Sequence, residues 1–139
     1  MNRPRFHLAF PVRDLEEARA FYGGVLGCPE GRSSAEWVDF DLEGHQIVAH
    51  LAPQDLADVS THQVDGQAAP VRHFGLILST RRWRALARRL EAAGVRFLIP
   101  PTTRFFGLPG EQQTLFLIDP SGNAVEFKSF ADDRAVFAN

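Results

Sequence analysis

The feature that most constrains the fold of this chain is an order of secondary-structure elements that occurs twice. In each half a short apolar strand leads into a helix and then into further strands, first over residues 6–51 and again over residues 72–130. The repeat lies in the order of elements and not in residue identity. Neither half is large enough to be stable alone, whereas 139 residues suffice for one compact domain. We therefore predict an α+β fold in which two modules pack together and enclose a cavity.

The first module is expected to span residues 5–52. A short apolar strand covers residues 6–12, and Asp14–Glu17 is a capping box that starts a helix. Strands are predicted over residues 36–42 and 45–51, because the first alternates polar and apolar residues and the Glu43-Gly44 turn reverses the chain between them.

The second module is expected to span residues 71–130. A strand over residues 71–78 precedes Thr80, a candidate N-cap. The helix that follows carries apolar residues at helical spacing: Trp83, Leu86, Ala87, Leu90 and Ala93. A strand over residues 95–99 is expected to end at Pro100-Pro101, and two more cover residues 113–118 and 124–130. Residues 53–70 show no strong periodicity and are predicted to be a linking loop.

Composition narrows the class of protein. A net charge of −2 gives no general attraction to nucleic acid or to anionic membranes. The single cysteine, Cys28, excludes an intrachain disulfide, and no signal peptide or membrane-length apolar run is visible, so we expect a cytoplasmic protein. A cluster of basic residues is interpreted as the solvated face of the second helix: Arg81, Arg82, Arg84, Arg88 and Arg89.

Two histidines occupy matching places in the repeat. His7 lies in the first strand of module one and His73 in the first strand of module two, 66 residues further on. Glu126 is a carboxylate within the apolar last strand, and a buried charge of this kind needs a partner or a metal ion. Two imidazoles and a carboxylate suit divalent iron or manganese, and imidazole also suits zinc and nickel. We predict one divalent metal ion, of unknown identity, held by His7, His73 and Glu126.

His50 lies near the end of the last strand of module one, and we match it with Glu126 in module two. Three roles stay open for it: a fourth metal ligand, a catalytic group that transfers a proton, or a structural residue. The other histidines, His45 and His62, are expected to play no part in the site.

Two stretches of sequence resemble a known superfamily. The opening segment Phe6–Asp14 with the following Asp14–Tyr22 and Val25–Gly27, and the closing segment Leu117–Phe127, are similar to the vicinal oxygen chelate group. This group contains glyoxalases, bleomycin resistance proteins and extradiol dioxygenases. The resemblance covers about residues 5–130, and its motifs are specific for the superfamily but not for one reaction.

The resemblance implies two βαβββ modules that form a U-shaped mixed sheet around the metal, with His7, His73 and Glu126 at the family's ligand positions. It implies an enzyme whose small substrate chelates the cation, with lyase, isomerase or ring-cleaving dioxygenase chemistry, and a homodimer. Glyoxalase lyases carry Glu or Gln near the place of His50, and dioxygenases carry Tyr near the place of Phe116. The alternative is a bleomycin-resistance-like protein that sequesters a small molecule without turnover.

Overall fold

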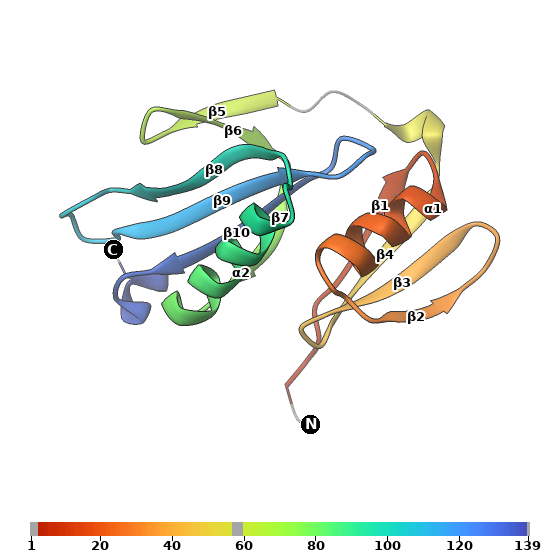
Figure 1. The fold of residues 1–139 in the computed structure, drawn as a ribbon, viewed down its shortest axis with the longest axis horizontal. Coiled ribbons are helices and arrows are strands. Elements are labelled where there is room, and N and C mark those ends of the chain that lie inside the picture. The colour runs from red at the N-terminus through yellow and green to blue at the C-terminus, as the bar shows by residue number, and fades with distance from the viewer. Residues whose placement is uncertain (1–2, 57–59, 139) are drawn as a thin grey trace. The chain divides into compact units, whose positions relative to one another are not determined.

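The chain forms two compact units in the computed structural model, which describes residues 3–56 and 60–138 (Figure 1). Unit 1 contains Met1–Asp58 together with Asp119–Asn123, and unit 2 contains Val59–Ile118 together with Ala124–Asn139. The turn between the last two strands of the chain thus belongs to the first unit.

Unit 1 is a four-stranded mixed sheet with one helical segment, and its strands follow the order β1-β4-β3-β2. β1 and β4 are parallel, and the other neighbours are antiparallel. The elements are β1 (His7–Val12), α1 (Leu15–Ala18) with a π-helical continuation (Arg19–Val25), β2 (Glu30–Ser33), β3 (Trp37–Leu42), β4 (His45–Leu51) and a 3-10 turn (Pro53–Asp55).

Asp14 is the N-cap of α1, because its carboxylate accepts a hydrogen bond of 2.8 Å from the amide of Glu17, which confirms one half of the predicted capping box. The Glu17 carboxylate accepts instead from the guanidinium of Arg13. The helix then widens, and the amide of Leu26 donates to the carbonyl of Phe21 over 2.9 Å, an i→i+5 bond. β2 was missed by the sequence reasoning because all of Glu30–Ser33 is exposed and polar or glycine, so no alternating pattern marks it.

The core of unit 1 is built around Tyr22, which is fully buried. Its ring lies against three phenylalanines, Phe10, Phe21 and Phe40, with centroids 4.9 to 5.5 Å away. Its hydroxyl donates a 2.7 Å hydrogen bond to Oδ2 of Asp119, in the turn that belongs to this unit. Asp119 also accepts from the amides of Ser121 and Asn123, so this buried carboxylate is fully used.

Tyr22 should make unit 1 sensitive to alkaline pH. Burial, reinforced by the Asp119 carboxylate, raises the pKa of Tyr22 well above its ordinary value of 10.0. The unfolded chain therefore ionises first, and stability that is complete below about pH 10 is lost as the pH rises further. We expect Tyr22→Phe to remove this alkaline decline and to cost about 1–3 kcal/mol near pH 8 through the lost hydrogen bond.

Because Tyr22 is the only tyrosine in the chain, ultraviolet titration of tyrosinate absorbance reports on this group alone. Urea unfolding of both proteins at about pH 8 and about pH 11 supplies the stability comparison. Ionisation of Tyr22 in the folded protein near pH 10 would show that the hydroxyl is not held as described.

Unit 2 repeats the architecture of unit 1, with strand order β7-β10-β9-β8, and adds a separate hairpin of β5 and β6. β7 and β10 are parallel, and the remaining neighbours are antiparallel. The elements are β5 (Ser60–Val64), β6 (Gln67–Val71), β7 (Phe74–Ile77), α2 (Thr80–Ala92), β8 (Phe97–Arg104), β9 (Gln112–Ile118), β10 (Ala124–Phe130) and a 3-10 turn (Asp133–Phe137). Both units therefore contain the predicted βαβββ module, and the α+β class is confirmed.

The hairpin replaces much of the predicted linking loop. Its two strands meet at Asp65-Gly66, where both residues have positive φ angles, 48° and 79°. Two such residues form the tight turn that two-residue hairpins use. The flanking strands are short and lack clear alternation, which explains why periodicity alone indicated a loop.

The prediction that Pro100-Pro101 ends a strand was wrong. β8 continues through both prolines to Arg104, with irregular pairing to β9 between Ile99 and Thr102. β8 is one of the two outer strands of the sheet, so a proline, which lacks an N–H, is tolerated where that backbone position lies on the unpaired side of the strand.

α2 covers one face of the unit 2 sheet. Ser79, rather than the predicted Thr80, caps it by accepting from the amide of Arg82. Trp83, Ala87 and Leu90 are buried as the periodicity predicts, and the indole N–H of Trp83 donates to the carbonyl of Phe127 over 2.8 Å. The five arginines of this helix are exposed. Among the described residues, no helix has both the length and the apolar character needed to cross a membrane.

Candidate metal centre

Unit 2 brings together two of the three predicted metal ligands. His73 lies immediately before β7, and Glu126 lies on β10, the parallel neighbour of β7. Nε2 of His73 is 3.2 Å from Oε1 of Glu126. The Glu126 side chain is 7% exposed and that of His73 35%, so the pair is reachable from solvent through the imidazole.

The position of the His73 ring is fixed by its other nitrogen. Nδ1 lies 2.6 Å from the carbonyl oxygen of Pro70, and because a carbonyl only accepts, Nδ1 carries the proton. The ring also packs edge-on against Phe116, with centroids 4.9 Å apart. A histidine held in this way keeps the Nε2 lone pair for a metal or a second proton.

The two side chains shift each other's ionisation. The hydrogen bond to Glu126 raises the pKa of His73 more than burial lowers it, and the Pro70 carbonyl adds to the rise. Burial raises the pKa of Glu126, but bonds from His73 and from the hydroxyl of Thr114, with the charge of Lys128, bring it below its ordinary value. Without metal, both shifts favour the charged forms, an imidazolium beside a carboxylate.

These two residues fit a divalent cation. A metal with ligand atoms about 2.1 Å away at right angles holds those atoms about 3.0 Å apart, close to the observed 3.2 Å between Nε2 and Oε1. An imidazole nitrogen and a carboxylate oxygen suit iron, manganese, nickel and zinc. A cation can take the place of the proton that His73 and Glu126 share.

A glycine makes the close approach of the strands possible. Gly75 on β7 pairs with Glu126 on β10, and a Cβ placed on Gly75 would lie 1.5 Å from the backbone oxygen of Glu126. Only glycine allows the two strands to meet here, and this contact lies two residues from His73. The sequence reasoning did not single out Gly75.

In unit 1, His7 has its own anchoring partners. It is the first residue of β1 and pairs with Gln46 on β4, and its Nδ1 lies 2.7 Å from Oε1 of Gln46. The side-chain Nε2 of Gln46 in turn donates a 3.2 Å hydrogen bond to Oδ2 of Asp39 on β3. The bond to Gln46 anchors Nδ1 of His7, as the Pro70 carbonyl anchors Nδ1 of His73, and in both rings Nε2 is the nitrogen left to bind a proton or a metal.

His50 does not occupy the place in unit 1 that Glu126 occupies in unit 2. Glu126 pairs with Gly75, two residues after His73, whereas the residue two after His7 is Ala9, which pairs with Val48. His50 pairs with Pro11 instead, four strand positions beyond the partner of His7, or about 13 Å along the strand. Its expected match with Glu126 was therefore wrong, although its role as a ligand or proton-transfer group stays a prediction.

The remaining histidines lie outside this arrangement. Nδ1 of His45 accepts a hydrogen bond from the amide of Phe6, and His62 is an exposed residue of the β5–β6 hairpin. Within the parts of the chain that the structure describes, neither unit by itself gathers three His, Cys, Asp or Glu side chains at metal-binding distance.

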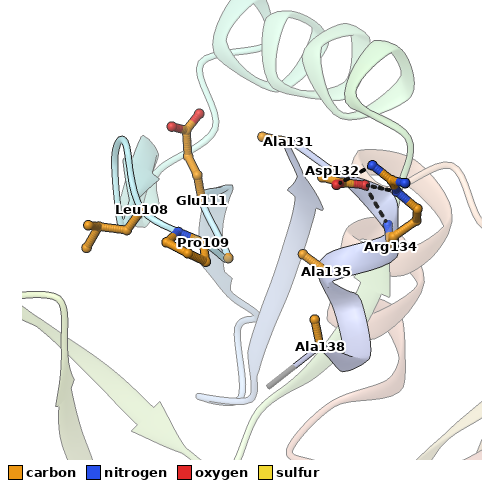
Figure 2. Close-up of a pocket in the computed structure, with 9 residues that line it drawn as sticks. Leu108, Pro109, Glu111, Ala131, Asp132, Arg134, Ala135 and Ala138 are labelled. Carbon is orange, nitrogen blue, oxygen red and sulfur yellow. Dashed lines mark hydrogen bonds and ion pairs between the residues drawn. The ribbon is translucent and has the colours of Figure 1, made fainter.

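A hollow of about 480 Å³ lies elsewhere in unit 2 (Figure 2). Its walls are the loop at Leu108–Glu111 and the C-terminal segment, where Asp132 and Arg134 form an exposed ion pair at 3.1 Å. No histidine lines it.

Comparison with known proteins assigns the family. The model of the Glyoxalase/Bleomycin resistance protein/Dioxygenase superfamily matches residues 6–127. A glyoxalase/bleomycin resistance protein/dioxygenase structure from Alicyclobacillus acidocaldarius is 36% identical, with a TM-score of 0.84 over 99% of this chain and 100% of that one. A search among curated proteins gives no match.

More distant structures share the fold. The fosfomycin resistance protein FosX from Listeria monocytogenes is 19% identical, with a TM-score of 0.68 over 93% of this chain and 94% of that one. Lactoylglutathione lyase from Agrobacterium tumefaciens is 17% identical, with a TM-score of 0.65 over 98% and 97%. The family match over most of the chain and the two βαβββ modules agree: this chain belongs to the glyoxalase, bleomycin resistance protein and dioxygenase superfamily, the vicinal oxygen chelate group.

Proposed function

We propose that this protein is a divalent-metal-dependent enzyme that acts on a small oxygen-chelating substrate by lyase, isomerase or dioxygenase chemistry. The observation that carries the proposal is the His73–Glu126 pair, with its 3.2 Å between Nε2 and Oε1 and its protonated Nδ1. The third ligand in the proposal is His7, because its Nδ1 is anchored in the same way and it begins the equivalent strand.

The metal would be iron, manganese, nickel or zinc, each compatible with two imidazoles and one carboxylate. When bound, it would supply Lewis-acid stabilisation of negative charge on substrate oxygens, or a site for dioxygen. The chain's own part is to orient the ligands: Pro70 holds the imidazole of His73, Gln46 holds that of His7, and Thr114 holds the Glu126 carboxylate. His50, exposed on β4, is proposed as the group that moves a proton.

Elemental analysis of purified protein tests this proposal. We expect about one metal ion per chain, retained after dialysis and lost in His7→Ala and His73→Ala. His62→Ala is the matched control, since this exposed histidine belongs to neither set of anchored residues, and it should keep the metal. His50→Ala should also keep the metal and lower only the rate of turnover.

The same experiment also distinguishes the enzyme from a sequestering protein. A wild-type protein that stays free of metal after incubation with all four cations, yet binds small molecules, would replace the proposed enzyme with a sequestering protein. Identical metal content in the His73→Ala variant would place the metal at other residues.

A further inference from the structure

Arg104 is a buried cation whose hydrogen-bonding capacity is not met by its neighbours. It is the last residue of β8 and is 5% exposed. Its Nε donates a long 3.3 Å bond to Oε1 of Gln67 on β6, and its guanidinium lies 5.6 Å from the ring centroid of Phe116. Nη2 has no hydrogen-bond partner among the described residues. Guanidinium groups carry five N–H donors, and buried donors without acceptors are rare in folded proteins.

Glu126 is the nearest carboxylate, but it does not satisfy Arg104. The distance from Nη1 of Arg104 to Oε2 of Glu126 is 3.7 Å, whereas a charge-assisted bond of this kind is about 2.7–2.9 Å long. Each oxygen of Glu126 already has another partner, because Oε1 faces His73 and Oε2 accepts from Thr114. In the guanidinium fork of Arg104, Nη2 therefore remains a buried donor without an acceptor among the described residues, beside the His73–Glu126 pair.

The charges around Arg104 favour an anion. Lys128 lies two residues after Glu126 on β10, so the two side chains are on the same face of the sheet, and Lys128 pairs with Thr114 on β9. Arg104 and Lys128 bring two positive charges to a face with one carboxylate, and a divalent metal bound there would add two more. A neutral substrate would leave this excess positive charge uncompensated in a buried setting, whereas an anionic one would balance it.

We propose that Arg104 binds an oxyanion of the substrate, so that the enzyme acts on a small anionic compound carrying a carboxylate or phosphonate group. The inference rests on the proposed function for the role of that compound as substrate. In the structure the amide oxygen of Gln67 holds one donor of the fork, and the substrate oxyanion takes its place. The bond to Gln67 is long, so exchanging a neutral acceptor for a charged one favours the ligand.

The position of Gln67 also explains how the guanidinium of Arg104 is shielded from solvent. It lies on β6, and Ala69 of the same strand packs with Ile99, Phe116 and Ala124 of the sheet. The hairpin thus covers the guanidinium from this side. Binding of the oxyanion requires the side chain of Gln67, which is half-buried, to move aside by rotation about its own side-chain bonds.

Titration with acetate and with methylphosphonate, followed by amide NMR shifts of metal-loaded and chelator-treated protein, tests the proposal. Wild type should bind one of the two probes saturably, and the preferred probe shows whether the group is planar or tetrahedral. Arg104→Met should weaken binding at least tenfold. Arg88→Met, which removes an exposed arginine of α2, should leave it unchanged.

A second variant does not depend on the folding of Arg104→Met. Gln67→Glu places a carboxylate on the fork and should compete with the probe, so that binding weakens although Arg104 is present. Binding unaffected in both Arg104→Met and Gln67→Glu, or no binding of either probe by wild type, would overturn the proposal.

Metal titration of the same samples separates this inference from the proposed function. Metal binding without Arg104-dependent anion binding overturns the oxyanion site alone. Arg104-dependent anion binding in a protein that takes up no metal upholds the oxyanion site and overturns the metal enzyme.

Discussion

Replacing Gly75 with alanine is expected to lower the free energy of unfolding by about 3 kcal/mol or more. The new methyl group would lie 1.5 Å from the Glu126 carbonyl oxygen and 2.6 Å from its carbon. Both atoms belong to the backbone of β10, an inner strand of the sheet, and cannot rotate away. β7 must therefore move off β10, which separates His73 from Glu126. Urea unfolding followed by tryptophan fluorescence measures the loss.

Gly24→Ala is the matched control for the glycine substitution. Gly24 lies in the helical segment of unit 1, and a Cβ there would meet no atom within 4 Å. Alanine favours helix over glycine by about 0.8–1 kcal/mol, so this variant should be as stable as wild type or slightly more stable. A Gly75→Ala protein within about 0.5 kcal/mol of wild type would show that the strands do not approach as described.

Replacing Glu126 with glutamine is expected to have two separable effects. The variant keeps the shape of the side chain but removes the only carboxylate ion-paired with both His73 and Arg104 among the described residues. Removing one partner of a buried ion pair costs about 3 kcal/mol, because the remaining charge stays buried without compensation. Loss of a residue that only supports a ligand typically lowers metal affinity roughly 10–100-fold. Because Glu126 is proposed as a ligand itself, its replacement should lower the metal affinity by more than that.

The double variant Glu126→Gln/Arg104→Met distinguishes these effects. It removes both charges, so most of the lost stability should return, while the metal affinity should stay low. Calorimetry of metal binding and urea unfolding of the four proteins in the cycle provide both quantities. Equal metal affinity in Glu126→Gln and wild type would exclude Glu126 from the metal site.

Local pattern predicted most elements of the fold. The alternation over residues 37–42, the apolar stripe of α2 and the Asp119–Asn123 turn all appear where their residues indicate. The errors arose where the secondary structure of a segment depends on its position in the tertiary fold. A proline is tolerated in β8 because that strand is at the edge of its sheet, and strand order is not visible in the local sequence.

The candidate site was predictable only in part, for a related reason. His73 and Glu126 were identified from residue type and from their places in the repeat, and the structure brings them together. Their supporting groups depend on which strand residues face each other. Gln46 was missed because its contact with His7 follows from the register of β1 on β4. The mismatch of His50 with Glu126 has the same origin. The two residues were matched by their places near the ends of the last strands, whereas their equivalence depends on which residue of the neighbouring strand each one pairs with.

The most direct test of the proposed metal centre is histidine NMR of protein labelled with ¹⁵N at its five imidazoles, recorded before and after zinc is added. The proposal predicts that the Nε2 resonances of His7 and His73 shift on saturation at one zinc per chain, while Nδ1 of each stays protonated and His45 and His62 are unchanged. Zinc saturation that leaves the resonances of His7 and His73 in place would contradict the proposed ligand set.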